Sequence, residues 1–291
     1  MNANAQISRR QFLSLAGGLA AVCGLGLVGC GGSGSAASTT AAASTAAADD
    51  SANITELTLG FDQAYPPYGF VGDDGIFTGF DIDLAGEVCK RNSWELNLEP
   101  IDWDAKDTLL NSGAITCIWN GFTMEGREDG YTFSDPYMLN EQVIVVKAGS
   151  DISDFAGLSG KTVMTQVDSA ALDVLEGDQA EVAATFKGGA AQTIGDYNNA
   201  FMQLDSGMID AVACDLSIAQ YQIAANPDKY VQLPTALSTE HYAVGFKKGD
   251  TELAQKVTET LKQLDADGTV KQLCEKYASY GISYDNWVLG K

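Results

Sequence analysis

The sequence predicts an α/β protein with two lobes and largely parallel sheets. Two observations predict this fold class: short apolar strand patterns alternate with amphipathic helix patterns, and the alternation runs through two successive blocks of the chain. The composition is globular, because 45% of the 291 residues are hydrophobic. A chain of this length can bury a sizeable core, either as one large domain or as two moderate ones.

The first block opens with a strand over residues 56–61, in which Leu57, Leu59 and Phe61 alternate with polar residues, and a turn around Pro66 follows it. The pattern then alternates in chain order: a helix from about residue 80 to 89 with Asp81 placed to cap it, a strand over 96–101, a helix over 104–112, a strand over 114–119 and a strand over 143–146.

The second block repeats the alternation. Its expected elements are a strand over 161–166, a helix over 170–175, a helix over 197–206, a strand over 209–214 and a helix over 216–225. A strand over 241–247 and a long amphipathic helix through residues 253–264 complete the pattern.

The charge of the chain is strongly negative. There are 17 Lys and Arg residues against 39 Asp and Glu residues, a net charge of -22. A field of this sign repels phosphate backbones and anionic headgroups, so the composition argues against nucleic-acid binding and against docking through a basic patch.

The first 30 residues resemble an export signal. Arg9 and Arg10 precede an apolar run rich in Gly and Ala, in a Ser-Arg-Arg-x-Phe-Leu pattern similar to a twin-arginine signal. A small residue directly before Cys30 resembles the lipobox of bacterial lipoproteins, which implies a lipid anchor on Cys30 and a location on the extracytoplasmic face of the cell membrane. The alternative is a plain transmembrane anchor, for which residues 12–28 are just long enough.

Residues 31–53 are almost entirely Gly, Ser, Ala and Thr. Such a segment cannot build a core, so we expect a disordered tether between the export signal and the folded body.

The cysteines and the histidine give little sign of metal or redox chemistry. Beyond the export signal the cysteines are widely spaced and form no C-x-x-C pair, and His241 is the only histidine of the chain. We therefore expect no cofactor, and a structural role for His241 in its apolar strand. The thiols are expected to be buried, with a disulfide as the alternative in an exported protein: Cys89, Cys117, Cys214 and Cys274.

Four segments in order resemble family 3 of the extracellular solute-binding proteins, the polar amino-acid receptors of ABC importers. They are Leu57 to Tyr68, Gly79-Phe80-Asp81-Ile82-Asp83-Leu84, Phe133-Ser134-Asp135-Pro136-Tyr137 and Ala211-Val212-Ala213-Cys214-Asp215. The resemblance runs from about residue 57 to residue 277, nearly the whole folded body.

The resemblance implies the type II periplasmic-binding-protein fold, in which two crossover hinge strands join two lobes around a ligand cleft. By analogy, lobe 1 comprises residues 54–146 and 239–291, and lobe 2 comprises residues 147–238. It also implies a monomeric, high-affinity receptor that closes on an amino acid and delivers it to the permease of an ABC importer.

An amino acid needs a cation for its carboxylate and an acid for its ammonium group. Arg127 matches the carboxylate-binding arginine of the family, with a surface helix arginine as the alternative. Asp215 follows an apolar strand directly, where ligands bind in α/β lobes, and matches the ammonium-binding acid. Its alternative is a plain helix cap.

Other positions complete the predicted ligand shell. Before Arg127, the loop of Asn120, Gly121 and Thr123 is rich in donors but is one residue shorter than the common family pattern. The turn at Ser169 offers backbone N–H groups to the carboxylate, although Asp168 beside it departs from the family pattern.

Lobe 1 contributes the side-chain pocket, where Asp62, Tyr65 and Trp103 match cleft positions. The two aromatic residues could equally be partly buried core residues, and Asp62 could simply organise the Pro-Pro turn. Gln166 and Cys214 match lobe 2 positions that vary with ligand preference, and because neither is charged they favour a polar, uncharged amino acid.

Two other functions fit the same fold. One is a periplasmic dehydratase that acts on cyclic prephenate-like acids, with Asp62 or Asp215 as general acid. The other is a lipoprotein that senses a ligand and signals to a membrane partner. The anchor and the pairing of Arg127 with Asp215 favour a receptor that is not an enzyme.

Overall fold

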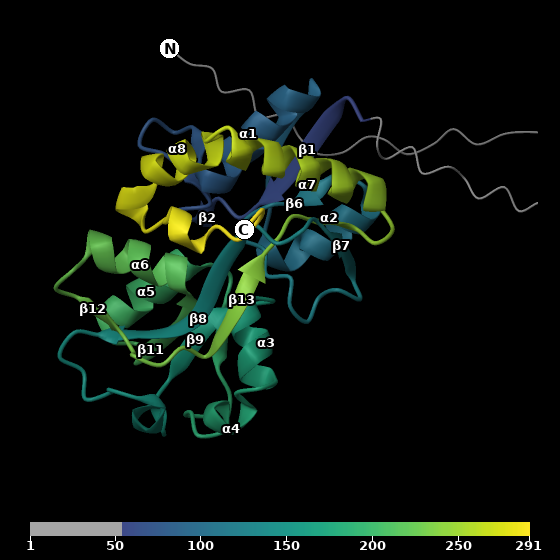
Figure 1. The fold of residues 1–291 in the computed structure, drawn as a ribbon. Coiled ribbons are helices and arrows are strands. Elements are labelled where there is room, and N and C mark those ends of the chain that lie inside the picture. Colours follow the sequence, from purple (N-terminus) through teal and green to yellow (C-terminus); the bar gives the residue numbers. More distant parts are fainter. Residues whose placement is uncertain (1–53) are drawn as a thin grey trace, which may run out of the picture. The chain divides into compact units, whose positions relative to one another are not determined.

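The described part of the chain, residues 54–291 of the computed structural model, is built on two mixed sheets with helices packed against them (Figure 1). The predicted export signal, the lipid site Cys30 and the tether lie outside the described residues. Within residues 54–291, no helix has the length and apolar character needed to cross a membrane.

The first sheet has five strands in the order β5-β1-β6-β14-β7. β1 lies parallel to β5 and β6, whereas β14 is antiparallel to β6 and β7. The alternation in the first strand is confirmed, because Leu57, Leu59 and Phe61 are fully buried. The strands are β1 (Glu56–Phe61), β5 (Glu95–Pro100), β6 (Cys117–Ile118), β7 (Tyr131–Phe133) and β14 (Gly245–Lys247).

Helices from both ends of the described chain cover this sheet. Figure 1 shows α7 and α8, the last helices in sequence, beside α1 near β1. The chain reverses at Gly268, whose φ of 85° suits glycine, and this ends the long helix predicted through residue 264 and begins a second one. The helices are α1 (Phe80–Asn92), α2 (Lys106–Ser112), α7 (Thr251–Ala266) and α8 (Thr269–Lys276), with short 3₁₀ turns at Trp103–Ala105, Ala278–Tyr280 and Tyr284–Asn286.

The second sheet has six strands, with β10-β9-β11-β8-β12 in order and β13 also paired to β8. β9 is parallel to β10 and β11, and β8 is antiparallel to its neighbours. Its strands are β8 (Met138–Lys147), β9 (Val163–Gln166), β10 (Gln192–Ile194), β11 (Ala211–Asp215), β12 (Tyr230–Gln232) and β13 (Ser238–Tyr242). Its helices are α3 (Ala170–Glu176), α4 (Ala180–Ala183), α5 (Tyr197–Ser206) and α6 (Leu216–Ala225), with a 3₁₀ turn at Phe155–Leu158.

A small third sheet precedes α1. It contains β2 (Ala64–Tyr65), β3 (Gly69–Val71) and β4 (Phe77–Thr78), which pair antiparallel in that order. The turn predicted around Pro66 lies between β2 and β3.

Two stretches of chain pass between the large sheets. The single strand predicted over residues 241–247 is wrong: β13 pairs with β8 in the second sheet, and β14 pairs with β6 and β7 in the first. The other passage runs from β7 into β8, and the two lie side by side, since Tyr137 N donates to Tyr242 O at 2.9 Å. Residues 138–146, counted with lobe 1 in the sequence, therefore pair within the second sheet.

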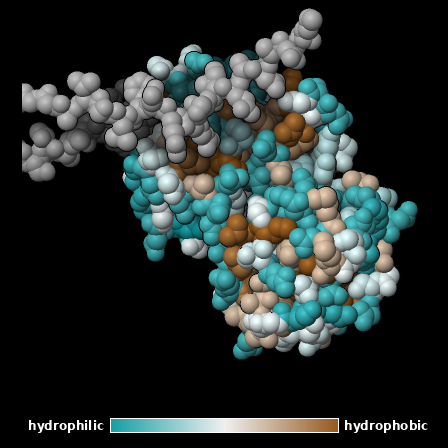
Figure 2. Space-filling view, turned by 180° about the vertical axis from the view of Figure 1, so that it is seen from behind, coloured by the Kyte–Doolittle hydropathy of each residue, from teal (hydrophilic) through white to brown (hydrophobic). Residues whose placement is uncertain are grey.

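The visible surface agrees with the acidic, globular composition. Figure 2 shows hydrophilic residues over most of the visible face, with hydrophobic residues in small groups among them. The large hydrophobic side chains that remain exposed are few and scattered in sequence: Val71, Ile76, Met202, Met208 and Val231. Single exposed apolar residues of this kind are ordinary and indicate no docking surface.

Candidate ligand-binding site

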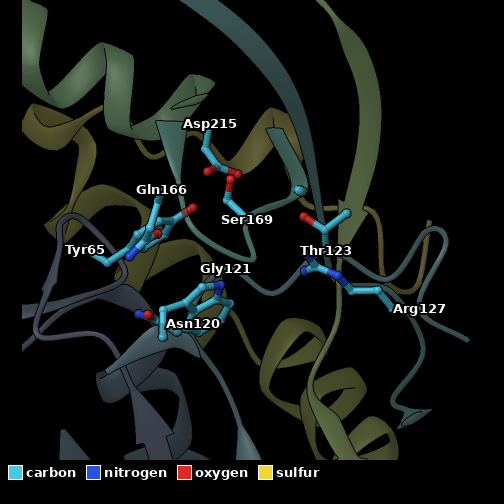
Figure 3. A pocket seen from close by; sticks show the side chains of 10 residues that line it. Tyr65, Asn120, Gly121, Thr123, Arg127, Gln166, Ser169 and Asp215 are labelled. Atoms are coloured by element: carbon cyan, nitrogen blue, oxygen red, sulfur yellow. The ribbon is translucent and has the colours of Figure 1, made fainter. Parts of the chain in front are cut away.

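A small cavity lies where the two large sheets meet (Figure 3). Of the residues predicted for the ligand site, only Asp62 and the fully buried Cys214 do not line it, and Ala170 is an addition. The lining residues are Tyr65, Trp103, Asn120, Gly121, Thr123, Arg127, Gln166, Ser169, Ala170 and Asp215. Among these described residues only Arg127 and Asp215 carry charged side chains, one of each sign.

Asp215 is the last residue of β11 and stands directly before α6. It occupies the N-cap position, but its side chain makes no capping bond, so the helix-cap alternative is wrong. Instead, Asp215 Oδ1 accepts hydrogen bonds from Asn140 at 3.0 Å, Gln142 at 2.7 Å and the hydroxyl of Tyr242 at 2.7 Å. Burial raises the pKa of this carboxyl, and the hydroxyl and amide donors oppose the rise.

Arg127 lies in the loop between β6 and β7, outside any helix. Its side chain is only 11% exposed, and its guanidinium lies over the ring of Phe122, 5.1 Å from the centroid. One nitrogen donates to Asp168 O at 3.1 Å and to the carboxylate of Asp173 at 2.8 Å, both from the segment around the start of α3. The alternative of a surface helix arginine does not fit these contacts. Asp173 was not singled out by sequence reasoning.

The loop before Arg127 has fewer free donors than its sequence indicates. Thr123 Oγ1 donates to Glu240 at 2.8 Å, and Asn120 Oδ1 accepts from the backbone N–H of Asp62 at 2.9 Å. The side-chain nitrogen of Asn120 is buried and has no partner among the described residues. The hydroxyl of Thr123 is therefore left with only acceptor capacity at the cavity.

Asp81 fixes the shape of the same loop. The structure corrects its predicted role as a helix cap, because Gly79 occupies the cap position of α1 and Asp81 points into the core. Its carboxylate accepts the N–H of Gly121 at 2.6 Å and the hydroxyl of Tyr137 at 2.8 Å. Burial raises the pKa of Asp81 to about 7, and these donors limit the rise.

Asp62 lies behind the cavity wall. Its carboxylate accepts the N–H of Ala64 at 2.8 Å and the amide of Gln166 at 2.7 Å, so it organises the start of the turn and ties the ends of β1 and β9 together. Burial is the main reason that its pKa is raised. Asp62 borders a neighbouring hollow that also holds Asp102, Asp104 and Asp196.

The turn before α3 is held by its own side chains. Ser169 caps α3 by accepting the N–H of Leu172 at 3.2 Å. The carboxylate of Asp168, a departure from the family pattern, faces away from the cavity toward the ammonium of Lys106 at 3.4 Å. The Asp168 carbonyl accepts the indole N–H of Trp103 at 3.1 Å, which links this turn to the first sheet.

The predicted aromatic residues are both core and cavity wall. Tyr65 is 6% exposed and Trp103 8% exposed, and Trp103 packs edge-on against Phe122 with the ring centroids 5.6 Å apart. The two alternatives posed by the sequence thus coexist, since each residue belongs to a buried hydrophobic cluster and also lines the cavity.

Sequence reasoning missed the crossover-strand residues beside Asp215. Glu240 and Tyr242 come from β13, and Asn140 and Gln142 come from β8. The available signal was an acid at an inward position of a strand, two residues before a buried tyrosine. His241, between them in β13, is half-buried, and its Nδ1 lies 2.7 Å from Glu125. The expected burial of the thiols is confirmed, and all are free: Cys89, Cys117, Cys214 and Cys274.

Comparisons with known proteins agree with this architecture. Residues 57–280 match the family "Bacterial extracellular solute-binding proteins, family 3". The L-cystine-binding protein TcyJ of Escherichia coli (strain K12) is 29% identical over 224 residues, which cover 76% of this chain and 82% of that protein.

Solved structures extend the comparison. An ABC uptake transporter substrate-binding protein from Streptococcus pneumoniae with bound histidine is 33% identical, with a TM-score of 0.75 over 79% of this chain and 95% of that one. The ancestral amino-acid-binding protein AncCDT-1, described as a precursor of cyclohexadienyl dehydratase, is 29% identical, with a TM-score of 0.69 over 77% and 95%. The predicted two-lobe fold is thereby confirmed, and the chain belongs to family 3 of the bacterial extracellular solute-binding proteins.

Proposed function

We propose that the cavity binds an amino acid by both ends of its zwitterion and that the protein delivers it to an ABC importer. The observation that carries this proposal is the pairing of one buried cation with one buried acid in a single small cavity, Arg127 and Asp215. A guanidinium binds a carboxylate with two parallel hydrogen bonds, and a carboxylate in a dry site binds an ammonium group strongly.

The surrounding groups divide into two matching ends. Asp215 is the acid for the ammonium group, and Thr123 adds oxygen lone pairs to the cavity because its proton is donated to Glu240. Arg127 is the cation for the carboxylate, and its guanidinium contacts the turn that leads to Ser169 and Ala170. An ammonium group only donates hydrogen bonds and a carboxylate only accepts them, so the two partners suit the two ends of a zwitterion.

The remaining wall supports a polar, uncharged ligand side chain. Tyr65, Trp103, Asn120 and Gln166 carry no charge. The acids of the neighbouring hollow, Asp62 among them, would instead attract a cationic side chain that reached past Gln166. A panel of amino acids separates these preferences.

Hinge closure is the proposed mechanism, in which lobe 1 is built on the first sheet and lobe 2 on the second sheet with β8 and β13, and the two turn about the passages at residues 134–137 and 243–244. Bonds between the two parts support it: Trp103 and Arg127 donate to Asp168, and Gln166 donates to Asp62. These bonds exist only when the lobes are together, so a ligand that joins the same walls selects the closed state. Small-angle scattering should show compaction with a bound amino acid, and tight binding without compaction contradicts the hinge.

The proposed location is the extracytoplasmic face of the cell membrane, with Cys30 as the lipid anchor and residues 31–53 as the tether. The export signal and the family support this location. Metabolic labelling with a radioactive fatty acid should mark the wild-type chain and not Cys30→Ala. A labelled Cys30→Ala chain would contradict the anchor.

We further propose that the protein is a monomeric receptor, not an enzyme, and that it needs no cofactor. Asp62 is one candidate general acid for the dehydratase reaction. Its carboxylate accepts hydrogen bonds from Ala64 and Gln166, and it does not line the cavity. The test is a thermal-shift screen of residues 54–291 against the twenty standard amino acids and prephenate. A ligand at 100 times its dissociation constant stabilises its protein by about 2.7 kcal/mol. Stabilisation by an amino acid supports the receptor, whereas turnover of prephenate favours the dehydratase.

A further inference from the structure

Two buried carboxylates, Asp215 and Glu240, share the same pair of amide donors. Gln142 Nε2 donates at 2.7 Å to Asp215 Oδ1 and at 2.7 Å to Glu240 Oε1. Asn140 Nδ2 donates to the same two oxygens at 3.0 and 2.8 Å. Asp215 is 4% exposed and Glu240 3% exposed, so the two acids form one cluster out of contact with bulk water.

No cation neutralises this cluster. Within residues 54–291, neither acid forms an ion pair with Lys, Arg or His. Arg127 lines the same cavity but donates toward Asp168 and Asp173. The polar groups that face the two acids are uncharged: the hydroxyls of Tyr65, Thr123 and Tyr242 and the amides of Asn140 and Gln142.

Two like charges that share one dry site do not both ionise freely. Burial and then the charge of Asp215 raise the pKa of Glu240 to about 7, and burial raises the pKa of Asp215 as well. The cluster also contains a buried acceptor without a partner among the described residues, Gln142 Oε1, which a protonated carboxyl could satisfy. Near neutral pH the pair therefore carries a proton for part of the time.

Glu240 also decides how Thr123 faces the cavity. The one hydroxyl proton of Thr123 is donated to Glu240 at 2.8 Å, so only oxygen lone pairs remain for a ligand. Glu240 itself does not line the cavity. It therefore acts on a ligand through Thr123 and through the charge that it shares with Asp215.

We propose that Glu240 is a positioning residue at the ammonium end of the cavity, which fixes Thr123 as an acceptor and shares with Asp215 one proton that a bound ammonium group expels. This inference rests on the proposed amino-acid binding and deepens it. The expelled proton passes from the carboxyl pair to solvent, and the ammonium group keeps all of its own protons. Binding should therefore release a proton and strengthen as the pH rises through 7.

The experiment is calorimetry of the chain with L-glutamine and L-arginine, neither of which titrates between pH 6 and 8. The apparent binding enthalpy in buffers of different ionisation enthalpy gives the number of protons released. We expect about 0.5 to 1 proton near pH 6.5 and almost none near pH 8, with affinity rising up to about tenfold from pH 6 to pH 8.

Glu240→Gln is the test variant, because a glutamine keeps the acceptor for Thr123 and offers a donor to Gln142 Oε1. It should bind with almost no proton release and less than about twofold change over the same pH range. Glu141→Gln is the matched control: Glu141 is a half-buried neighbour on β8, paired in register with Thr239, and this variant should behave as wild type. Binding with no proton release in wild type, or an unchanged release in Glu240→Gln, overturns the inference.

A second measurement separates this inference from the proposed function. Carboxyl-carbon NMR of the protein labelled at glutamate, without amino acid, should show one signal that titrates near pH 7 and is missing in Glu240→Gln. If no amino acid binds but this signal is present, the receptor proposal fails and the shared proton stands. If amino acids bind and every glutamate titrates below about pH 5, the receptor stands and the shared proton is wrong.

Discussion

The carboxylate of Asp173 lies 2.8 Å from a guanidinium nitrogen of Arg127 and joins the loop before β7 to helix α3. The same nitrogen donates to the carbonyl of Asp168, so one arginine contacts α3 and the turn before it. Both bonds use one nitrogen, so the rest of the guanidinium remains for the proposed carboxylate contact. Arg127 thus connects the two walls of the cavity as well as lining it.

Asp173→Asn should weaken amino-acid binding by up to about fivefold, since the contact is charge-assisted but Asp173 is 60% exposed and screened by solvent. Calorimetry with the best amino acid of the screen measures the change, and the difference from wild type should shrink in high salt. Asp178→Asn, an exposed acid just after α3, is the control and should bind as wild type. Equal affinities for both variants would show that Asp173 does not contribute to amino-acid binding.

Gly121→Ala should destabilise the protein more than Gly126→Ala, a few residues along the same loop. Both glycines have positive φ, 57° and 79°, so both alanines carry a backbone cost of about 1 kcal/mol. A Cβ at Gly121 would also lie 3.1 Å from the rings of Tyr242 and Tyr68, whereas at Gly126 it would meet no atom within 4 Å. Urea unfolding of the two variants gives the difference, and a smaller loss at Gly121 would contradict the packing described.

Asp81 should make the protein less stable as the pH rises from about 4 to 7. Burial raises its folded-state pKa to about 7 from 3.8, so within this window the folded state binds more protons than the unfolded state. Its contribution is present below pH 4 and is lost as the pH passes 7, with a slope of up to about 1.4 kcal/mol per pH unit.

Asp81→Asn keeps an acceptor for the N–H of Gly121 and removes the titration. Its free energy of unfolding should therefore fall less steeply between pH 5 and 7 than that of wild type, by up to the same 1.4 kcal/mol per unit. Urea unfolding at several pH values measures both slopes, and parallel slopes would show that Asp81 stays ionised. Asp83→Asn, a partly exposed acid of the same helix turn, is the control.

Much of the fold was predictable because the strands of both blocks carry clear apolar patterns. The strands that were not predicted correctly have two causes. The local sequence of residues 241–247 predicts one apolar strand. Its two halves pair in different sheets, because β13 pairs with β8 and β14 pairs with β6, and local sequence does not determine this pairing. β2, β10 and β12 are too short to give a pattern of their own.

The candidate site was predictable where a residue follows a strand end, as Asp215 does, or where a family motif fixes it, as with Arg127. The acids that complete it could not be found in this way. Glu240 lies in a strand paired to β8, and its contacts with Thr123 and Asn140 join residues about a hundred positions apart. Asp62 matched a cleft position but is turned toward Ala64 and Gln166, which only the tertiary pairing determines.

The most direct test of the central claim is the thermal shift produced by the best amino acid of the screen in Arg127→Ala, Asp215→Ala and Trp103→Ala. Either charge variant leaves one end of the zwitterion without its partner, a loss of about 2 to 5 kcal/mol, so both shifts should vanish or nearly vanish. Trp103→Ala removes packing and one hydrogen bond to the Asp168 carbonyl but no charged partner of the ligand, and it should reduce the shift less. Arg91→Ala, whose arginine pairs with Asp267 at the surface, should keep it fully. If both charge variants bind normally while Trp103→Ala does not, the ligand is not held as a zwitterion and the account is wrong.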